Sequence, residues 1–154
     1  MEAHKDVELL RDQLSHLKKS YIKTVIMFGS RARGESTERS DVDLLVLHKG
    51  YKEEDPVRRR SHLYNLLREA IGKEFESLTI VDMKLEHFLK PRQISALLLN
   101  IYWDAIVVYD KTKIIPSFLE RVREKIDKSG LKRVEDERAY RWVLPKPMME
   151  VKIL

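Results

Sequence analysis

A Gly-Ser pair and an Asp-x-Asp pair, separated by ten residues, are the part of this chain whose residue types and spacing indicate chemistry. Gly29 and Ser30 follow an apolar run, and Asp41 and Asp43 lead into a second apolar run. Small residues allow a backbone to approach a phosphate group closely. Paired carboxylates suit hard divalent cations such as Mg²⁺, which bind carboxylate and phosphate oxygens together. The pattern therefore predicts phosphoryl or nucleotidyl transfer.

The two aspartates are expected to act together. Residues two apart in a strand point to the same side, so Asp41 and Asp43 would share one face. Two like charges at that separation are unfavourable unless cations neutralise them. The backbone amides around Gly29 and Ser30, and a short helix with Ser30 as its N-cap, are expected to bind the phosphate oxygens.

Two arginines follow the Gly-Ser pair. Arg31 and Arg33 are predicted to reach the triphosphate of a nucleotide, because guanidinium groups pair well with phosphate oxygens. A surface role is the alternative for either arginine.

A third carboxylate is also expected, since catalysis by two metals normally needs a further group to hold and activate the attacking hydroxyl. Asp82 is the first choice because it ends a predicted strand over residues 75–82, in phase with Leu78 and Ile80. The alternative role for Asp82 is the N-cap of the helix that follows. Glu76 shares this face and is the reserve choice.

Alternating strands and helices are expected to position these groups. Strands are predicted over residues 21–28, 41–48, 75–82 and 105–109, and helices over 2–20, 56–71, 85–89, 94–103 and 116–128. The alternation predicts an α/β (α+β) fold, a mixed β-sheet with flanking helices. Residues 1–110 would form the core, and residues 111–154 would add a C-terminal helix and a β-hairpin, with Tyr140 and Trp142 in core packing, on the same domain.

Composition limits the function classes. The 154 residues suit one domain, and 30 Lys+Arg against 25 Asp+Glu give a net charge of +5. Charges of both signs alternate along the chain, so we do not expect nucleic acid as the main partner. The absence of cysteine excludes disulfides and thiolate zinc sites. The longest apolar stretch, residues 94–109, contains Asn100 and Asp104, which argues against a membrane span and favours a cytoplasmic protein.

These residues resemble the minimal nucleotidyltransferases (MNT family) within the superfamily typified by DNA polymerase beta. The match comprises Gly29-Ser30, then Arg31-Ala32-Arg33-Gly34, then Asp41-Val42-Asp43 at the family's spacing. Asp82 matches the position of the family's third carboxylate. The resemblance covers residues 21–109.

The resemblance implies that Asp41 and Asp43 bind two Mg²⁺ ions and that Asp82 is a base or third metal ligand. Ser30 and Arg33 would contact the triphosphate. An acceptor hydroxyl would attack the α-phosphate of ATP or another nucleoside triphosphate and release pyrophosphate. Members of this group often form toxin–antitoxin pairs with a HEPN-domain protein, and some inactivate that toxin by transferring AMP to a tyrosine.

Two other functions remain open at this point. The chain could be a non-catalytic module that binds nucleotide or masks its partner. It could also be a small-molecule nucleotidyltransferase of the antibiotic-resistance type, although no separate substrate-binding segment is visible in the sequence. A homo-oligomer is compatible with either.

Overall fold

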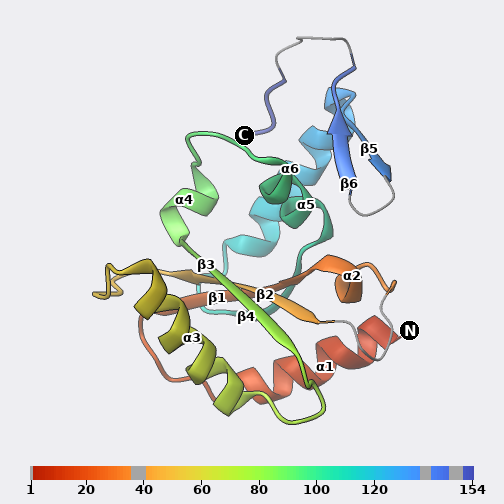
Figure 1. Cartoon of the computed structure of the whole chain (residues 1–154). Coiled ribbons are helices and arrows are strands. Elements are labelled where there is room, and N and C mark those ends of the chain that lie inside the picture. Colours follow the sequence, from red (N-terminus) through yellow and green to blue (C-terminus); the bar gives the residue numbers. More distant parts are fainter. Residues whose placement is uncertain (1, 36–40, 136–139, 146–150) are drawn as a thin grey trace.

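Six helices and six strands are found in the computed structural model, which describes residues 2–35, 41–135, 140–145 and 151–154 (Figure 1). In chain order they are α1 (Glu2–Leu14), β1 (Ile22–Phe28), α2 (Gly29–Ala32), β2 (Val42–His48), α3 (Pro56–Ala70), β3 (Leu78–Lys84), α4 (Leu85–Leu89), α5 (Ala96–Asp104), β4 (Ile106–Asp110), α6 (Ile115–Ser129), β5 (Lys132–Glu135) and β6 (Tyr140–Val143).

The central sheet has the strand order β3-β2-β1-β4. β1 pairs antiparallel with both β2 and β4, whereas β2 and β3 run parallel. Consequently the C-terminal end of β1 lies at the same end of the sheet as the first residues of β2, β3 and β4. This side, formed by strand ends and not by an outer strand, is the sheet edge referred to below. This mixed sheet with flanking helices confirms the predicted fold class.

Helices cover both faces of the sheet, as Figure 1 shows. One apolar cluster joins α1 and α3 to the even-numbered positions of the two parallel strands: Val42, Leu44, Val46, Leu78 and Ile80. A second cluster joins α4, α5 and α6 to Leu45 and Leu47 of β2, on the opposite face. Side chains alternate between the two faces along a strand. In β2 and β3, even-numbered side chains therefore face α1 and α3, and odd-numbered side chains face α4, α5 and α6.

The start of α3 and the end of α6 lie close to their predicted positions and have clear local causes. Asp55 caps α3, since its Oδ1 accepts a hydrogen bond from the amide of Val57 at 2.9 Å, and Pro56 is the first helical residue. Gly130 ends α6 in the left-handed conformation at φ 84°.

Three predicted details are wrong. α1 ends at Leu14 rather than near residue 20, because the chain turns there and the amide of Leu17 donates to the carbonyl of Leu14 at 3.0 Å. β3 begins and ends later than predicted. In α3, the residue types predict a buried stripe of Val57, Tyr64, Leu67 and Ile71. Leu67 and Ile71 are buried as this stripe requires, but Val57 is 74% exposed and Leu63 is buried in its place.

The C-terminal hairpin is present as β5 and β6, which pair antiparallel. It packs on α5, where the indole of Trp142 donates to Asn100 Oδ1 at 2.9 Å and meets Trp103 edge-to-face with ring centroids 6.0 Å apart. Tyr140 and Trp142 are half-buried, not exposed. The division of the chain near residue 110 stays a prediction.

Within the described residues, no helix is both long and apolar enough to cross a membrane. The expected cytoplasmic location stays a prediction.

Candidate active site

Gly29 and Asp43 meet at the sheet edge where β1 ends and β2 begins. Phe28, the last residue of β1, pairs with Asp43 across the antiparallel ladder, so the next residue turns directly over this carboxylate. A Cβ atom placed on Gly29 would lie 2.1 Å from Asp43 Oδ2, and Gly29 has φ 78°. Glycine is therefore needed here for two reasons, the left-handed backbone and the space that the carboxylate occupies.

Asp41 lies beside Asp43 but in a different environment. Asp41 is exposed, and it accepts hydrogen bonds from the hydroxyls of Ser77 and Thr79, the latter at 3.0 Å. These two hydroxyls lower the pKa of Asp41 below its ordinary value, and the charge of Arg31 contributes. Ser77 precedes β3 and Thr79 lies within it, so the parallel pairing of β2 and β3 brings the hydroxyls to this edge.

Asp43 has the opposite shift. Burial raises its pKa, and the negative charge of Asp41 raises it further, while the Thr79 hydroxyl and Arg33 act in the other direction. The negative charges of the two carboxylates thus repel each other. A bound cation would relieve that repulsion, which is how carboxylate metal sites commonly work.

The donor set fits a hard cation that also binds phosphate. Mg²⁺ is usually held by one or two protein carboxylates together with substrate oxygens, which is the number found here. No group of three or more histidine, aspartate or glutamate side chains suited to a metal occurs within the part of the chain that the structure describes. Asp41 and Asp43 are the side chains at this site that could hold such an ion.

Ser30 does not have its predicted place as an N-cap. α2 begins at Gly29, its N-cap is Phe28, and no side chain caps the helix. Ser30 is instead the second residue of α2, and its carbonyl accepts from the amide of Glu35 at 2.9 Å. The glycine and serine still lie at the expected edge, directly after β1.

Arg31 is tied to the N-terminal helix. Its guanidinium donates to Asp6 Oδ2 of α1 at 2.9 Å and lies over the ring of Phe75 at 5.6 Å. Both charged groups of this ion pair are largely buried, with 12% and 17% of their side chains exposed. Arg31 thus anchors α2, while its charge still acts on Asp41.

Arg33 is held by the second half of the chain. Its Nη1 donates to Asp104 Oδ2 at 3.1 Å, and its Nε donates to Glu35 at 3.0 Å. The guanidinium also lies 4.5 Å from the centre of the Tyr140 ring. Arg33 lies near enough to Asp43 to lower its pKa. The predicted contact of Arg33 with a triphosphate stays a prediction.

The hairpin completes this flank of the site. The ring of Tyr140 contacts two guanidiniums, those of Arg33 and Arg133, with Arg133 at 4.3 Å from the ring centre. Its hydroxyl donates to Glu35, which lowers the pKa of that carboxyl and raises the pKa of the phenol. Arg133 also donates to Asp104 at 2.8 Å. β6 is therefore joined to the segment that follows α2.

Asp82 is not part of this site, which corrects the prediction of a third carboxylate. It is the fifth residue of β3 and pairs with Val46, three rungs beyond the pair of Asp43 with Thr79. That offset corresponds to about 10 Å along the strand. Asp82 also has the parity of Leu78 and Ile80 and so faces the α1 and α3 layer, opposite to Asp43.

The environment of Asp82 is a buried ionic network. Its side chain is only 2% exposed, and its Oδ2 accepts from Nε2 of His48 at 2.8 Å and from Nε of Arg59 in α3. The alternative role as an N-cap does not apply either, because Lys84 is the N-cap of α4. Glu76, the reserve choice, precedes β3 and is exposed.

Sequence reasoning missed four groups that shape this site: Ser77, Thr79, Glu35 and Asp104. The two hydroxyls could have been found only from the register of β3 against β2. Asp104 ends α5, and its carboxylate is 5% exposed between two arginines. An acid at the end of a largely apolar helix was the local signal in the sequence that pointed to Asp104.

Comparison with known proteins gives one family match. Residues 7–140 match a family model described as a nucleotidyltransferase domain. A relative from Methanocaldococcus jannaschii, named provisionally as a protein adenylyltransferase, is 29% identical over 122 residues, 77% of this chain and 79% of the relative. Another from that organism with the same provisional name is 34% identical over 73 residues, 47% of this chain and 71% of the relative.

Two solved structures are also similar. One is described provisionally as a nucleotidyltransferase from Sulfolobus solfataricus, with 20% identity, a TM-score of 0.42, and coverage of 73% of this chain and 83% of that chain. The other is a tri-AMPylated Shewanella oneidensis HEPN toxin in complex with an MNT antitoxin, with 18% identity, a TM-score of 0.40, and coverage of 84% and 87%.

Proposed function

Because this chain belongs to the nucleotidyltransferase domain family and is a nucleotidyltransferase, we propose that it transfers AMP from ATP to an acceptor hydroxyl on a protein. The observation that carries the proposal is the convergence of Gly29, Asp41 and Asp43 at one edge of the sheet. The relatives named provisionally as protein adenylyltransferases support ATP as the donor and a protein as the acceptor.

The acceptor that we propose is a tyrosine of a HEPN-domain toxin, which would make this chain an antitoxin. The sequence pattern from Gly29 to Asp43 supports this choice, because antitoxins of the minimal nucleotidyltransferase type share it. In the reaction, the acceptor oxygen forms a bond to the α-phosphorus, the bond to pyrophosphate breaks, and the acceptor hydroxyl loses its proton.

Each residue of the site has a role in this proposal. Asp41 and Asp43 would hold Mg²⁺, and the ion would supply positive charge next to the phosphates during transfer. Gly29 leaves room for the carboxylate of Asp43, and the backbone amide of Ser30 would bind the triphosphate. Arg33 supplies positive charge. The expected second ion would rest on this same carboxylate pair, since Asp82 points elsewhere.

The test is transfer of label from α-³²P-labelled ATP with Mg²⁺ to a HEPN-domain protein encoded beside this chain. We expect label on the partner with the wild-type protein and none with Asp41→Asn/Asp43→Asn. The variant Asp12→Asn/Asp127→Asn removes the same charge from exposed positions away from the sheet edge and should transfer normally.

Three outcomes would contradict the proposal. Equal transfer by Asp41→Asn/Asp43→Asn would exclude the carboxylate pair as the site. Binding of Mg²⁺·ATP without transfer would indicate a non-catalytic module that masks its partner. Label recovered on an added aminoglycoside, but not on protein, would indicate a small-molecule nucleotidyltransferase.

A further inference from the structure

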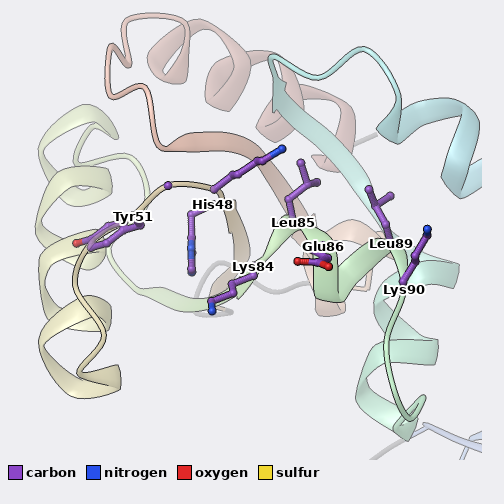
Figure 2. A pocket seen from close by; sticks show the side chains of 9 residues that line it. His48, Tyr51, Lys84, Leu85, Glu86, Leu89 and Lys90 are labelled. Carbon is purple, nitrogen blue, oxygen red and sulfur yellow. The ribbon is translucent and has the colours of Figure 1, made fainter.

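A cavity of about 620 Å³ opens at the end of the sheet opposite to the aspartate pair. It lies where the parallel strands β2 and β3 end, at His48 and Lys84, and it is bounded by the loop after β2 and by α4. Figure 2 shows His48 and Tyr51 on one side and Leu85, Glu86, Leu89 and Lys90 on the other. Ligands of α/β sheets commonly bind outside the carboxyl ends of parallel strands.

Positive charge gathers around this cavity. Lys49 follows β2, Lys84 and Lys90 flank α4, and Glu86 is the one carboxylate among the lining residues. Within the described chain, none of the three lysines forms a salt bridge. The three charges would attract an anionic ligand into this hollow.

The wall beneath the lysines is built from buried polar groups. His48 is 4% exposed and lines the cavity, and its Nε2 is bonded to Asp82, which also binds Arg59. Burying an acid, a guanidinium and an imidazole is costly, and apolar residues of similar size often give a more stable protein. Asp82 holds the imidazole of His48 in one orientation at the cavity wall, and nucleotidyl transfer at the other edge makes no use of this.

The remaining lining is apolar and aromatic. Leu85 and Leu89 contribute aliphatic surface, and the Tyr51 ring is fixed by edge contact with Tyr21 at 4.3 Å and lies 5.6 Å from His48. The volume falls in the range of pockets for small organic ligands, on the order of 300–1,000 Å³. A purely inorganic anion would leave this apolar surface uncovered.

We propose that this cavity binds a small phosphorylated ligand of mononucleotide size. The lysines bind its phosphate as point charges, and Leu85, Leu89 and Tyr51 cover its organic part. The proposal does not depend on the transfer reaction, since the cavity and the aspartate pair lie at opposite ends of β2. Asp41→Asn/Asp43→Asn is expected to keep this binding.

The test uses AMP as the probe, titrated into the full chain in EDTA and followed by amide chemical shifts in ¹H–¹⁵N NMR. We expect shifts at Gly50, Leu85 and Leu89. Lys84→Gln/Lys90→Gln should weaken binding by about tenfold or more, as expected for losing contacts to a charged phosphate. The control Lys18→Gln/Lys73→Gln removes two exposed lysines elsewhere and should change the affinity less than about twofold.

Several results would overturn the proposal. Shifts confined to residues 28–43 would place AMP at the aspartate edge alone, and equal weakening by both lysine pairs would show that net charge suffices. Adenosine binding as tightly as AMP would exclude phosphate recognition, and inorganic phosphate doing so would exclude recognition of the organic part. A single-stranded oligonucleotide that moves these amides where AMP does not would make nucleic acid the occupant.

Discussion

Gly29 lies so close to Asp43 that a methyl group at position 29 would overlap the carboxylate, at 2.1 Å from Oδ2. The left-handed backbone of Gly29 and the position of Asp43 are thus one structural feature, since each is set by the same antiparallel pair at the end of β1. The glycine of the Gly-Ser pair therefore serves the carboxylate as well as any phosphate that approaches it.

The first prediction concerns Gly29→Ala, with Gly34→Ala as its control. Both glycines have positive φ, 78° and 75°, but the structure places nothing within 4 Å of a Cβ at Gly34. Both substitutions should cost roughly 1–2 kcal/mol of stability through backbone strain. Only Gly29→Ala should displace Asp43 and abolish Mg²⁺-dependent binding of a non-hydrolysable ATP analogue, measured by calorimetry. Equal binding by the two variants would show that the contact is unimportant.

The second prediction separates Asp82 from the metal site. Asp82→Asn should lower the free energy of unfolding by roughly 3 kcal/mol, because it leaves Arg59 without its buried partner. It should leave Mg²⁺-dependent nucleotide binding intact. Asp41→Asn should change the free energy of unfolding little, since Asp41 is exposed. It should instead abolish Mg²⁺-dependent nucleotide binding. Urea unfolding and calorimetry measure the two effects, and a stable Asp82→Asn protein that fails to bind Mg²⁺ would restore Asp82 as a ligand.

Asp82 also shows where the sequence stops being informative. The alternation within β3 correctly placed Asp82 on the face of Leu78 and Ile80. The sequence could not tell that this face is opposite to Asp43, because the relation between faces of two strands depends on their register. A shift of one residue in pairing would have reversed the result. Thr79, not Asp82, pairs with Asp43.

Local signals, in contrast, were sufficient where the structure itself is local. The cap at Asp55 and the stop at Gly130 involve only neighbouring residues, and the predicted ranges of these two helices agree with them to within one or two residues. The prediction that Asp41 and Asp43 lie on the same side needed only the alternation of side chains along one strand. The contact between Glu35 and Tyr140 joins residues 105 positions apart, and no periodicity in the sequence carries that information.

The third prediction tests whether the hairpin positions Arg33. Tyr140→Ala removes the ring that stacks on Arg33, whereas Tyr140→Phe keeps the ring and removes only the hydroxyl that donates to Glu35. A cation–π contact contributes about 0.5–1 kcal/mol, so Tyr140→Ala should weaken binding of the Mg²⁺·ATP analogue by about two- to fivefold. Tyr140→Phe should bind nearly as the wild type does. If both variants lose affinity equally, the hydroxyl rather than the ring positions Arg33.

The last prediction concerns alkaline pH and Tyr102, whose side chain is fully buried beside Phe88 and Phe118. Its hydroxyl donates to the carbonyl of Phe88 at 2.7 Å, and burial raises the pKa of Tyr102 above its ordinary value of 10.0. Tyr102→Phe should therefore cost about 1 kcal/mol near neutral pH through the lost hydrogen bond.

The sign of the pH effect follows from proton release. Above about pH 10 the unfolded chain loses the phenol proton and the folded chain keeps it, so the stability from Tyr102 is complete below that pH and falls as pH rises. Phenylalanine does not titrate, so the stability gap between wild type and Tyr102→Phe should shrink between about pH 8 and about pH 10.5. Urea unfolding at both values measures the gap. Tyr64→Phe, on the surface of α3, controls for removal of a phenol, and a constant gap for Tyr102→Phe would contradict the prediction.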